Sequence, residues 1–408
     1  MSRLFLGLFV ALSVIAGVVL AVLPGRGGAT AFVHARGTQI LAPDGSPLRV
    51  RGIGLGNWLV PEGYLFGFEN ATSPRQIAQV FREIAGPEAA NAFWRGWRTA
   101  FVGDADLAWL ARSGFNVVRI PFDYRLWTPE DQPGLWTDEG FAVLDPIVAS
   151  AARNGLYVML DMHAAPCGQN GQNIDNSDGV AHLYTDEACV RRAGDVWERI
   201  ARHYAGDPTI AGYELLNEPA PVAQGDVSAA QVMARITREL ATRIRHVDTH
   251  HLIFDNSLSW REDNPAPEPG IVPTFHLYWE EVKPDMLRRV LDFRARTGSP
   301  ILMSESGENS DDWVRAFRET LEAQDIGWIF WPYKKLDAPS APRSFDTPPY
   351  WEEIVAYQAL IERPARERLA QRPPVEHARS ALDGLLASVQ FGRTRVNDGY
   401  MRALGVAQ

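Results

Sequence analysis

Cysteine is nearly absent from this 408-residue sequence, which contains only Cys167 and Cys189. Two cysteines cannot build a disulfide-dense scaffold, so the chain must rely on a large hydrophobic core. In an oxidising compartment the two thiols could pair across the loop between them, and two free thiols are the alternative. The composition, 46% hydrophobic and 22% charged with 13 tryptophans, is that of a globular protein rich in aromatic side chains.

The chain also lacks an excess of positive charge, because 50 acidic residues outnumber 40 Lys and Arg and leave a net charge of −10. This balance argues against nucleic acid as a partner and fits a neutral substrate better than a polyanion. Several motifs are missing as well: no glycine-rich phosphate loop follows the first strand, and neither Gly-x-Ser-x-Gly nor His-Glu-x-x-His occurs. We therefore predict no nucleotide cofactor, no metal ion and no serine nucleophile.

One long hydrophobic run is present, over residues 4–23, with no charged residue inside it. Its length exceeds a typical signal-peptide core and is about the minimum for a bilayer-spanning helix. We expect residues 1–31 to be a signal peptide or membrane anchor plus a linker, with 29–31 (Ala-Thr-Ala) as a cleavage pattern. The protein is then extracytoplasmic, periplasmic or secreted, and either free or tethered to the membrane through residues 4–23. We expect a monomer.

Short apolar segments typical of buried strands alternate along the chain with amphipathic segments typical of helices. The predicted strands are residues 50–55, 116–120, 157–162, 212–216, 252–255, 272–275, 301–304 and 328–331. The predicted helices are residues 104–112, 139–153, 186–204, 229–247, 284–296 and 311–323. Eight near-continuously apolar strands alternating with helices predict an α/β fold, a closed (β/α)₈ TIM barrel.

Two further segments flank the predicted barrel. Residues 38–50 predict a short N-terminal hairpin whose turn is Asp44-Gly45, because glycine tolerates the positive φ of such turns. The Arg-rich segment 363–408 predicts a C-terminal helical extension with a helix near 376–388. We accordingly expect a catalytic domain over residues 32–362.

Two glutamates stand where predicted strands open into loops, which is the active-site face of such a barrel. Glu218 follows the fourth strand in 215–219 (Leu-Leu-Asn-Glu-Pro), and Glu305 ends the seventh in 302–307 (Leu-Met-Ser-Glu-Ser-Gly). Cleavage of a glycoside requires one carboxyl group that carries a proton and one that is ionised. A structural salt bridge is the alternative for either glutamate alone, but the pair predicts a glycoside hydrolase. Glu308 competes for the nucleophile position, although it lies beyond the strand end.

The sequence resembles glycoside hydrolase family 5, a family of retaining (β/α)₈ enzymes, over nearly all of residues 38–362. The motifs that carry the resemblance are Asn-Glu-Pro, Ser-Glu-Ser-Gly, Arg-Ile-Pro, Asp-Met-His, Phe-His-Leu-Tyr and Phe-Trp-Pro. The resemblance implies that Glu218 is the acid/base and Glu305 the nucleophile. It implies substrate or nucleophile contacts for Arg119, His163, Asn217, His276, Tyr278 and Trp331.

Two loops resemble those of family members related to exo-β-1,3-glucanases. Residues 54–62 place Glu62 where that group binds a terminal glucose, and residues 163–177 place Asp175 and Asn176 where it holds outer hydroxyl groups. The second loop departs from the pattern, because residues 172–174 lengthen it, Ala164 replaces a glycine and Cys167 replaces a small residue. The resemblance thus implies an exo-acting enzyme on β-1,3-glucan, with subsite shape left open.

Other side chains are candidates for the rim of the cleft and for outer subsites. Core packing is an equal alternative for the tryptophans among them. The candidates are Trp58, Trp127, Trp260, Trp279, Lys334, Lys335 and the insert 64–98. Three other functions stay open: an endo-β-1,4-glucanase, a transglycosylase on the same scaffold, and a non-catalytic carbohydrate-binding barrel.

Overall fold

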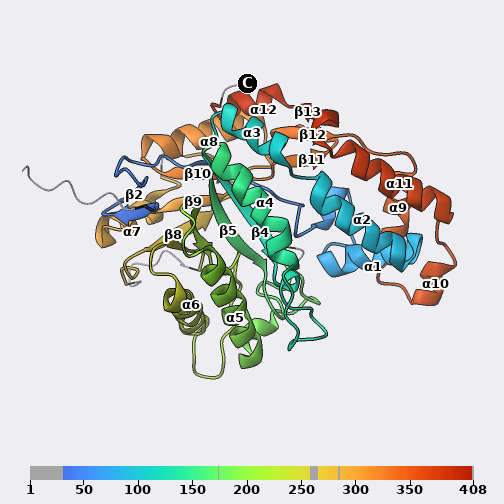
Figure 1. Cartoon of the computed structure of the whole chain (residues 1–408), viewed down its shortest axis with the longest axis horizontal. Coiled ribbons are helices and arrows are strands. Elements are labelled where there is room, and N and C mark those ends of the chain that lie inside the picture. The colour runs from blue at the N-terminus through green and yellow to red at the C-terminus, as the bar shows by residue number, and fades with distance from the viewer. Residues whose placement is uncertain (1–30, 173, 258–264, 284, 407–408) are drawn as a thin grey trace, which may run out of the picture.

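The computed structural model describes residues 31–172, 174–257, 265–283 and 285–406. Eight parallel strands form a closed barrel in chain order, because β10 pairs with both β9 and β3 (Figure 1). The strands are β3 (Arg51–Gly54), β4 (Val117–Asp123), β5 (Tyr157–Ala164), β6 (Ile210–Glu214), β7 (Leu252–Asp255), β8 (Ile271–His276), β9 (Leu302–Glu305) and β10 (Gly327–Phe330). The predicted (β/α)₈ barrel is confirmed, and each predicted strand overlaps an observed one.

Helices surround the barrel and cover its strands (Figure 1). They are α3 (Asp104–Arg112), α4 (Glu139–Arg153), α5 (Glu187–Tyr204), α6 (Ala229–Val247), α7 (Arg288–Thr297) and α8 (Asp311–Ala323). Helix α6 begins at a capping box in which the Ser228 hydroxyl accepts a hydrogen bond from the backbone N–H of Gln231. Helix α7 begins later than predicted, since turn residues directly precede Arg288.

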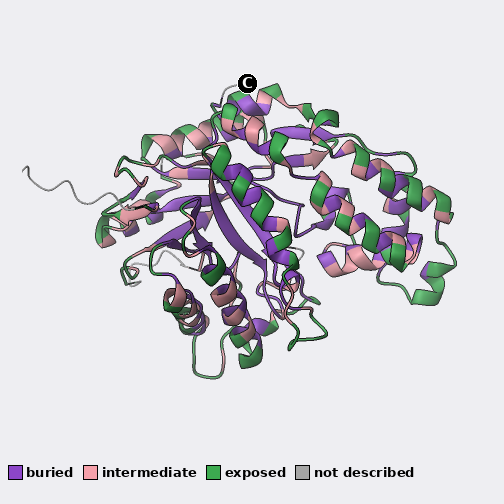
Figure 2. Ribbon diagram, in the orientation of Figure 1, coloured by how far each residue is buried: buried purple, intermediate pink, exposed green. Residues whose placement is uncertain are grey.

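Burial divides the barrel into an apolar lower part and a polar mouth. Apolar side chains from the start of most barrel strands pack together with Val33 and Ile40 of the N-terminal hairpin. Figure 2 shows the strands buried and the outer helix faces exposed. The bottom of the barrel is therefore closed, and the buried charged residues gather toward the C-terminal ends of the strands.

The N-terminal hairpin is present, but its strand pair lies earlier than predicted. Strand β1 (His34–Arg36) pairs with β2 (Gln39–Leu41) around Gly37, whose φ is +57°. Asp44-Gly45 does form a turn, yet only one isolated bridge, between Leu41 and Pro47, follows it. Backbone hydrogen bonds from the Ala42 N–H to the Ser46 oxygen and from the Leu48 N–H to the Ile40 oxygen join the two arms of this turn, so the predicted hairpin is present. Pro47 has no N–H group with which to extend a regular ladder.

A helical layer lies beside the barrel and joins the insert to the C-terminal segment (Figure 1). Its elements are α1 (Pro74–Ala85), α2 (Pro87–Ala100), α9 (Trp351–Gln358), α10 (Ala365–Leu369) and α11 (Val375–Ser388). Helix α11 packs on α2, α1 and α9. Arg368 of α10 and Glu83 of α1 form a buried ion pair at 2.6 Å. Most of the insert 64–98 thus belongs to this layer and does not line the cleft.

A small sheet and a last helix complete the C-terminal segment. Strands β11 (Lys334–Leu336), β12 (Arg343–Phe345) and β13 (Arg395–Val396) form this sheet, and α12 (Asp398–Ala403) packs on α8. In the described part of the chain, no helix is both long enough and apolar enough to cross a bilayer. The apolar run over residues 4–23 lies outside the described residues.

Candidate active site

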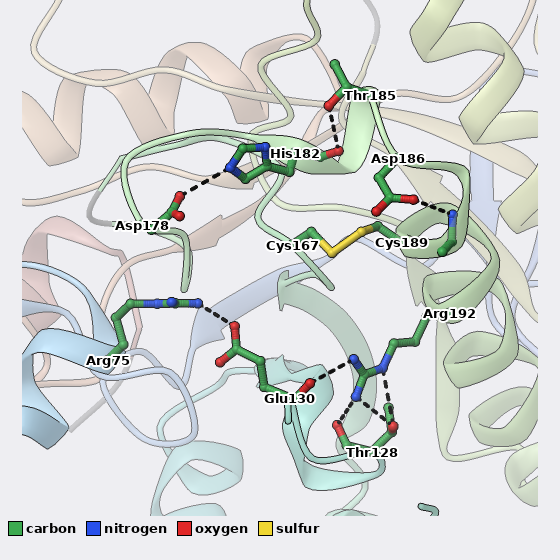
Figure 3. The surroundings of a disulfide bond; sticks show 11 residues. Arg75, Thr128, Glu130, Cys167, Asp178, His182, Thr185, Asp186, Cys189 and Arg192 are labelled. Atoms are coloured by element: carbon green, nitrogen blue, oxygen red, sulfur yellow. Dashed lines mark hydrogen bonds and ion pairs between the residues drawn. A yellow bond between two sulfur atoms is a disulfide. The ribbon is translucent and has the colours of Figure 1, made fainter. Parts of the chain in front are cut away.

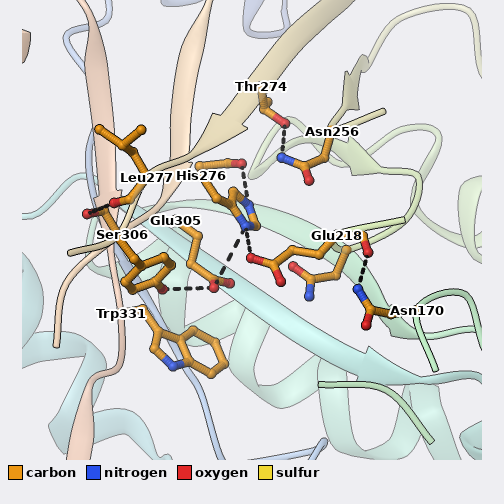
Figure 4. A network of polar contacts seen from close by, with 12 residues as sticks. Asn170, Glu218, Asn256, Thr274, His276, Leu277, Glu305, Ser306 and Trp331 are labelled. Atoms are coloured by element: carbon orange, nitrogen blue, oxygen red, sulfur yellow. Dashed lines mark hydrogen bonds and ion pairs between the residues drawn. The ribbon is translucent and has the colours of Figure 1, made fainter. Parts of the chain in front are cut away.

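The two predicted catalytic glutamates face each other at the mouth of the barrel. Glu305 is the last residue of β9, and Glu218 lies on the loop after β6. One oxygen of Glu218, one oxygen of Glu305 and one ring nitrogen of His276 all lie within 4.8 Å of one another. Figure 4 shows the His276 ring beside both carboxylates. The structure therefore brings together three residues that are up to 87 positions apart in sequence and lie at or just after the ends of β6, β8 and β9.

The surroundings of Glu305 keep its carboxyl group ionised. Its Oε2 accepts a hydrogen bond from Nη1 of Arg119 at 2.5 Å, and its Oε1 accepts one from the Tyr278 hydroxyl at 2.9 Å. Burial alone would raise the pKa of Glu305, but the positive charges of His276, Arg119 and His163 and the Tyr278 hydrogen bond lower it below its usual value. An ionised carboxylate is the form that a nucleophile requires.

Arg119 on β4 is fully buried and is held by a ring of acceptors. Its Nε donates to Oε2 of Glu214 at 2.5 Å, and its Nη2 donates to Oδ1 of Asn217 at 2.7 Å and lies 3.0 Å from Oδ2 of Asp161. A buried guanidinium is stable only with such partners, and they fix its direction toward Glu305. No role was predicted for Asp161, the first residue of the Asp-Met-His motif, or for Glu214, whose signal is a charged residue inside an apolar strand.

Glu218 lies in a more open environment than Glu305. Its side chain is 31% exposed against 8% for Glu305, and its Oε1 lies 2.7 Å from Nδ1 of His276. Nε2 of His276 is 3.1 Å from the Ser304 hydroxyl, and the backbone oxygen of Glu218 accepts a hydrogen bond from Asn170. Burial would lower the pKa of His276, but the two glutamates raise it. Glu218 is thus positioned by its neighbours while it remains accessible to solvent, as proton exchange requires.

Glu62, His163 and Trp331, from the segments that end or follow β3, β5 and β10, form a second part of the site. The His163 ring stacks on Trp331 with a centroid distance of 5.4 Å and an interplanar angle of 5°. Its Nδ1 lies 2.7 Å from Asp161, which fixes the ring, and its Nε2 lies 3.5 Å from Oε1 of Glu62. Burial raises the pKa of Glu62 to about 7, against the opposing effect of His163. Buried Oε1 of Glu62 accepts no hydrogen bond from the described residues.

Asp175 and Asn176 are both buried in the loop after β5, but only the Asp175 side chain makes hydrogen bonds within the described residues. The Asp175 carboxylate accepts backbone hydrogen bonds from Asn170, Gly171 and Ser177 at 2.6–3.0 Å, so it organises its own loop. The amide nitrogen and oxygen of Asn176 are buried without a partner among the described residues. The loop therefore leaves Asn176, rather than Asp175, with unused hydrogen-bonding capacity.

A disulfide ties the same loop to helix α5. Cys167 and Cys189 are bonded across a sequence separation of 22 residues, with their Cα atoms 6.0 Å apart (Figure 3). Cys167 has a φ of +67° and precedes Gly168, at which a Cβ would lie only 2.5 Å from the Ser177 side chain. The replacement of a small residue by Cys167 thus serves to anchor the lengthened loop, and of the two alternatives the structure shows the paired cysteines.

The side chains predicted to line the rim of the cleft differ in burial. Trp58 and Trp127 are buried in the core, whereas Trp279 is 70% exposed beside Tyr278; Trp260 lies outside the described residues. Lys334 is fully buried, with its Nζ bonded to Asp106 and to the backbone oxygens of Phe101 and Val389. The prediction that Lys334 lines the cleft is therefore wrong, because this side chain points away from the mouth into the layer beneath β11.

Two contacts at the mouth were not predicted. The Tyr64 hydroxyl accepts a hydrogen bond from Nε1 of Trp331 at 2.8 Å, and Lys335 donates to Oε1 of Glu308 at 2.8 Å. Tyr64 lies two residues after Glu62 in sequence. Its contact with Trp331 depends on the path of the loop and could not be predicted from that spacing.

A family model described as cellulase, glycosyl hydrolase family 5, matches residues 81–337, which is more than half of the chain. The chain is 32% identical over 234 residues to a β-xylosidase of Phanerodontia chrysosporium, covering 57% of this chain and 48% of that protein. It is 32% identical over 174 residues to a probable glucan 1,3-β-glucosidase A of Aspergillus clavatus, covering 42% and 41%. The chain thus spans less than half the length of these two curated relatives.

Other similar proteins extend the comparison. Endoglucanase C of Acetivibrio thermocellus is 22% identical over 303 residues, covering 58% of this chain and 85% of that protein. Among solved structures, an endogalactoceramidase aligns with a TM-score of 0.61 and 18% identity over 91% of this chain and 84% of that one. A rutinosidase from Aspergillus niger aligns with a TM-score of 0.56 and 20% identity over 70% and 90%. These two structures share the fold, and the family match establishes that the chain belongs to glycoside hydrolase family 5 and is a glycoside hydrolase.

Proposed function

We propose that this protein is a retaining β-glycosidase that removes sugars from the end of a β-glucan, with Glu305 as nucleophile and Glu218 as acid/base. The observation that carries the proposal is the contrast between two neighbouring carboxyl groups. Glu305 is buried against Arg119 and Tyr278, whereas Glu218 is partly exposed and bonded to His276. Two carboxyl groups in different environments are what acid/base and nucleophilic roles require.

The reaction proceeds by double displacement. Glu305 attacks the anomeric carbon while Glu218 donates a proton to the departing oxygen, and a covalent glycosyl–enzyme ester forms. Glu218 then removes a proton from water, whose oxygen attacks the anomeric carbon, breaks its bond to the Glu305 oxygen and releases the sugar and the Glu305 carboxylate. Retaining enzymes hold their carboxyl groups about 5–5.5 Å apart and inverting enzymes about 6.5–9.5 Å. One oxygen of each carboxylate lies within 4.8 Å of the other, a separation that supports the retaining course.

The residues around the glutamates have complementary tasks in this scheme. Arg119 and Tyr278 stabilise the Glu305 anion before attack and after the ester is hydrolysed. Asn217, which is held by Arg119 and lies 3.4 Å from His163, is placed beside Glu218 to bind a hydroxyl group of the reacting sugar. Trp331, which is buried and stacked on His163, forms the apolar floor beneath that ring.

The residues that would surround the transferred sugar suit a terminal glucose unit. Two buried polar groups have the capacity to bind sugar hydroxyl groups: Oε1 of Glu62, which has a 3.5 Å contact with His163, and the side-chain amide of Asn176, which has no partner among the described residues. Asp175 contributes by holding the loop that presents Asn176. The similarity to a glucan 1,3-β-glucosidase supports a β-1,3-linked glucan as substrate.

A second candidate is an endo-β-1,4-glucanase, which the similarity to endoglucanase C favours. Mass-spectrometric product analysis on laminarin and carboxymethyl cellulose separates the two. We expect single glucose units from laminarin; only long oligomers from the cellulose derivative would exclude exo action. Glu305→Gln should abolish turnover while glucan binding persists, and an active Glu305→Gln variant would exclude the mechanism.

We also propose that the protein works outside the cytoplasm. The Cys167–Cys189 disulfide supports an oxidising compartment. Fractionation of cells that produce the protein with or without residues 4–23 tests both the location of the protein and the proposed membrane tether.

A further inference from the structure

Tyr64, Glu308 and Lys335 come together at the barrel mouth from three neighbouring loops. Tyr64 lies in η1 (Gly63–Phe66) after β3, Glu308 follows β9, and Lys335 lies in β11 after β10. Strand β10 pairs with both β9 and β3, so these loops share one side of the barrel. Nζ of Lys335 donates to Glu308 at 2.8 Å and lies 5.9 Å from the centroid of the Tyr64 ring.

In this group, which we call the glycone wall, the Glu308–Lys335 ion pair is mostly buried and Tyr64 is bonded to Trp331. The Lys335 and Glu308 side chains are only 15% and 11% exposed, and Lys335 also donates to Ser340. The Tyr64 hydroxyl bonds the Trp331 indole. Behind the wall, Gly307 forms a backbone bridge with Trp331, and a Cβ at Gly307 would lie 2.3 Å from the Trp331 oxygen. The wall and the Trp331 ring are therefore fixed relative to one another.

The ring order of the strands places this wall opposite the proton donor. Glu218 follows β6, which is separated from β10 by three strands in either direction around the closed barrel. The leaving group must lie beside Glu218, because Glu218 protonates its oxygen. The sugar that is transferred to Glu305 then extends the other way, toward Glu62 and Trp331. The residues of the glycone wall follow β3, β9 and β10, on the same side of the mouth as Trp331.

We propose that Tyr64 and the Glu308–Lys335 ion pair close the glycone side after one sugar unit, and so restrict the enzyme to releasing single terminal sugars. The inference rests on the proposed function and names the side chains that set its product length. A buried ion pair costs desolvation free energy that an apolar pair of the same size does not, so stability alone is a weak reason for its presence here. A charged pair presents hydroxyl-binding groups to the outer edge of the terminal sugar while it blocks a second sugar.

The test compares Glu308→Ala/Lys335→Ala and Tyr64→Ala with the wild type. The double variant removes both charges, because a single substitution would leave one buried charge unpaired. Tyr64 is 37% exposed, so its replacement keeps the proposal testable if the double variant does not fold. Glu83→Ala/Arg368→Ala is the matched control, since that pair is equally buried but lies between α1 and α10.

The substrates are para-nitrophenyl β-glucoside and para-nitrophenyl β-laminaribioside, and products are identified by mass spectrometry. The wild type should release glucose one unit at a time, and the wall variants should release intact disaccharide, raising the disaccharide-to-glucose ratio about ten-fold. The control should keep the wild-type ratio. The proposed role of the wall would be overturned if folded variants hydrolysed the glucoside but released only glucose from the laminaribioside. It would also be overturned if the wild type released intact disaccharide from the laminaribioside. A wild type without activity on either glycoside would overturn the proposed function itself.

Discussion

Substitution of Gly307 by alanine tests whether the nucleophile strand and the Trp331 platform form one unit. Gly307 has a φ of +143°, which side-chain-bearing residues rarely adopt, and follows Glu305 by two positions. A Cβ there would lie 2.3 Å from the backbone oxygen of Trp331, within the bridge that joins the two loops. The methyl group and that oxygen must separate by roughly 1 Å to reach ordinary van der Waals contact.

To make room for the methyl group, the backbone must shift either at the Glu305 end of β9 or at Trp331, because the two segments are bonded directly to each other. Trp331 is also bound through its backbone N–H to Ser306 and through its indole to Tyr64. A misplacement of about 1 Å in an active site lowers the rate about 100-fold. We therefore expect kcat/KM of Gly307→Ala on an aryl β-glucoside to fall by about that factor, and the backbone strain to cost roughly 1–3 kcal/mol of stability.

Gly45→Ala is the matched control, since Gly45 also has a positive φ, +83°, but nothing lies within 4 Å of its added Cβ. Gly45→Ala should lose a similar amount of stability to backbone strain, measured by thermal unfolding, and retain wild-type kinetics. Equal activity of the two variants, with Gly307→Ala folded, would refute the idea that the bridge positions the site.

Three further predictions concern the proton, the nucleophile and the loop. Tyr278→Phe removes a hydrogen bond that lowers the pKa of the ionised nucleophile, so the acidic limb of the pH–rate profile should move to higher pH. Tyr213→Phe, which removes a buried Tyr–carboxylate bond outside the site, should leave that limb in place. Glu218→Ala should slow glucan cleavage at least about 100-fold but spare the first step with a dinitrophenyl leaving group, which burst kinetics would show. Reduction of the Cys167–Cys189 disulfide should lower stability by up to about 3 kcal/mol in thermal unfolding and raise KM more than it lowers kcat.

The sequence predicted the barrel and the two glutamates because both depend on local patterns. Eight apolar strands alternating with helices leave few topologies, and the C-terminal strand ends of a barrel meet at one face. Glu218 and Glu305 follow apolar strands directly, so their convergence required only the fold. Several predicted helices, such as α4, begin and end at the predicted residues because they have clear amphipathic patterns.

The partners of those glutamates could not be predicted in the same way. Glu214 and Asp161 bind Arg119 from strands that are distant in sequence, and only the closed barrel shows that all three point inward. Lys334 and Lys335 illustrate a second limit. In a three-residue strand the sequence pattern does not show which of two neighbouring lysines faces the core, and the structure buries Lys334.

The remaining difference between prediction and structure lies in how the loops are held. Trp331 is fixed by stacking on His163, by the Tyr64 hydroxyl and by the bridge to Gly307, so the glycone platform cannot move without the nucleophile. The loop after β5 is held instead by its own Asp175 carboxylate and by the disulfide to α5. The β5 loop also contacts the catalytic residues, because Asn170 donates to the backbone oxygen of Glu218 and the His163 ring at the end of β5 stacks on Trp331. A change in this loop should therefore alter substrate preference and the position of Glu218 together.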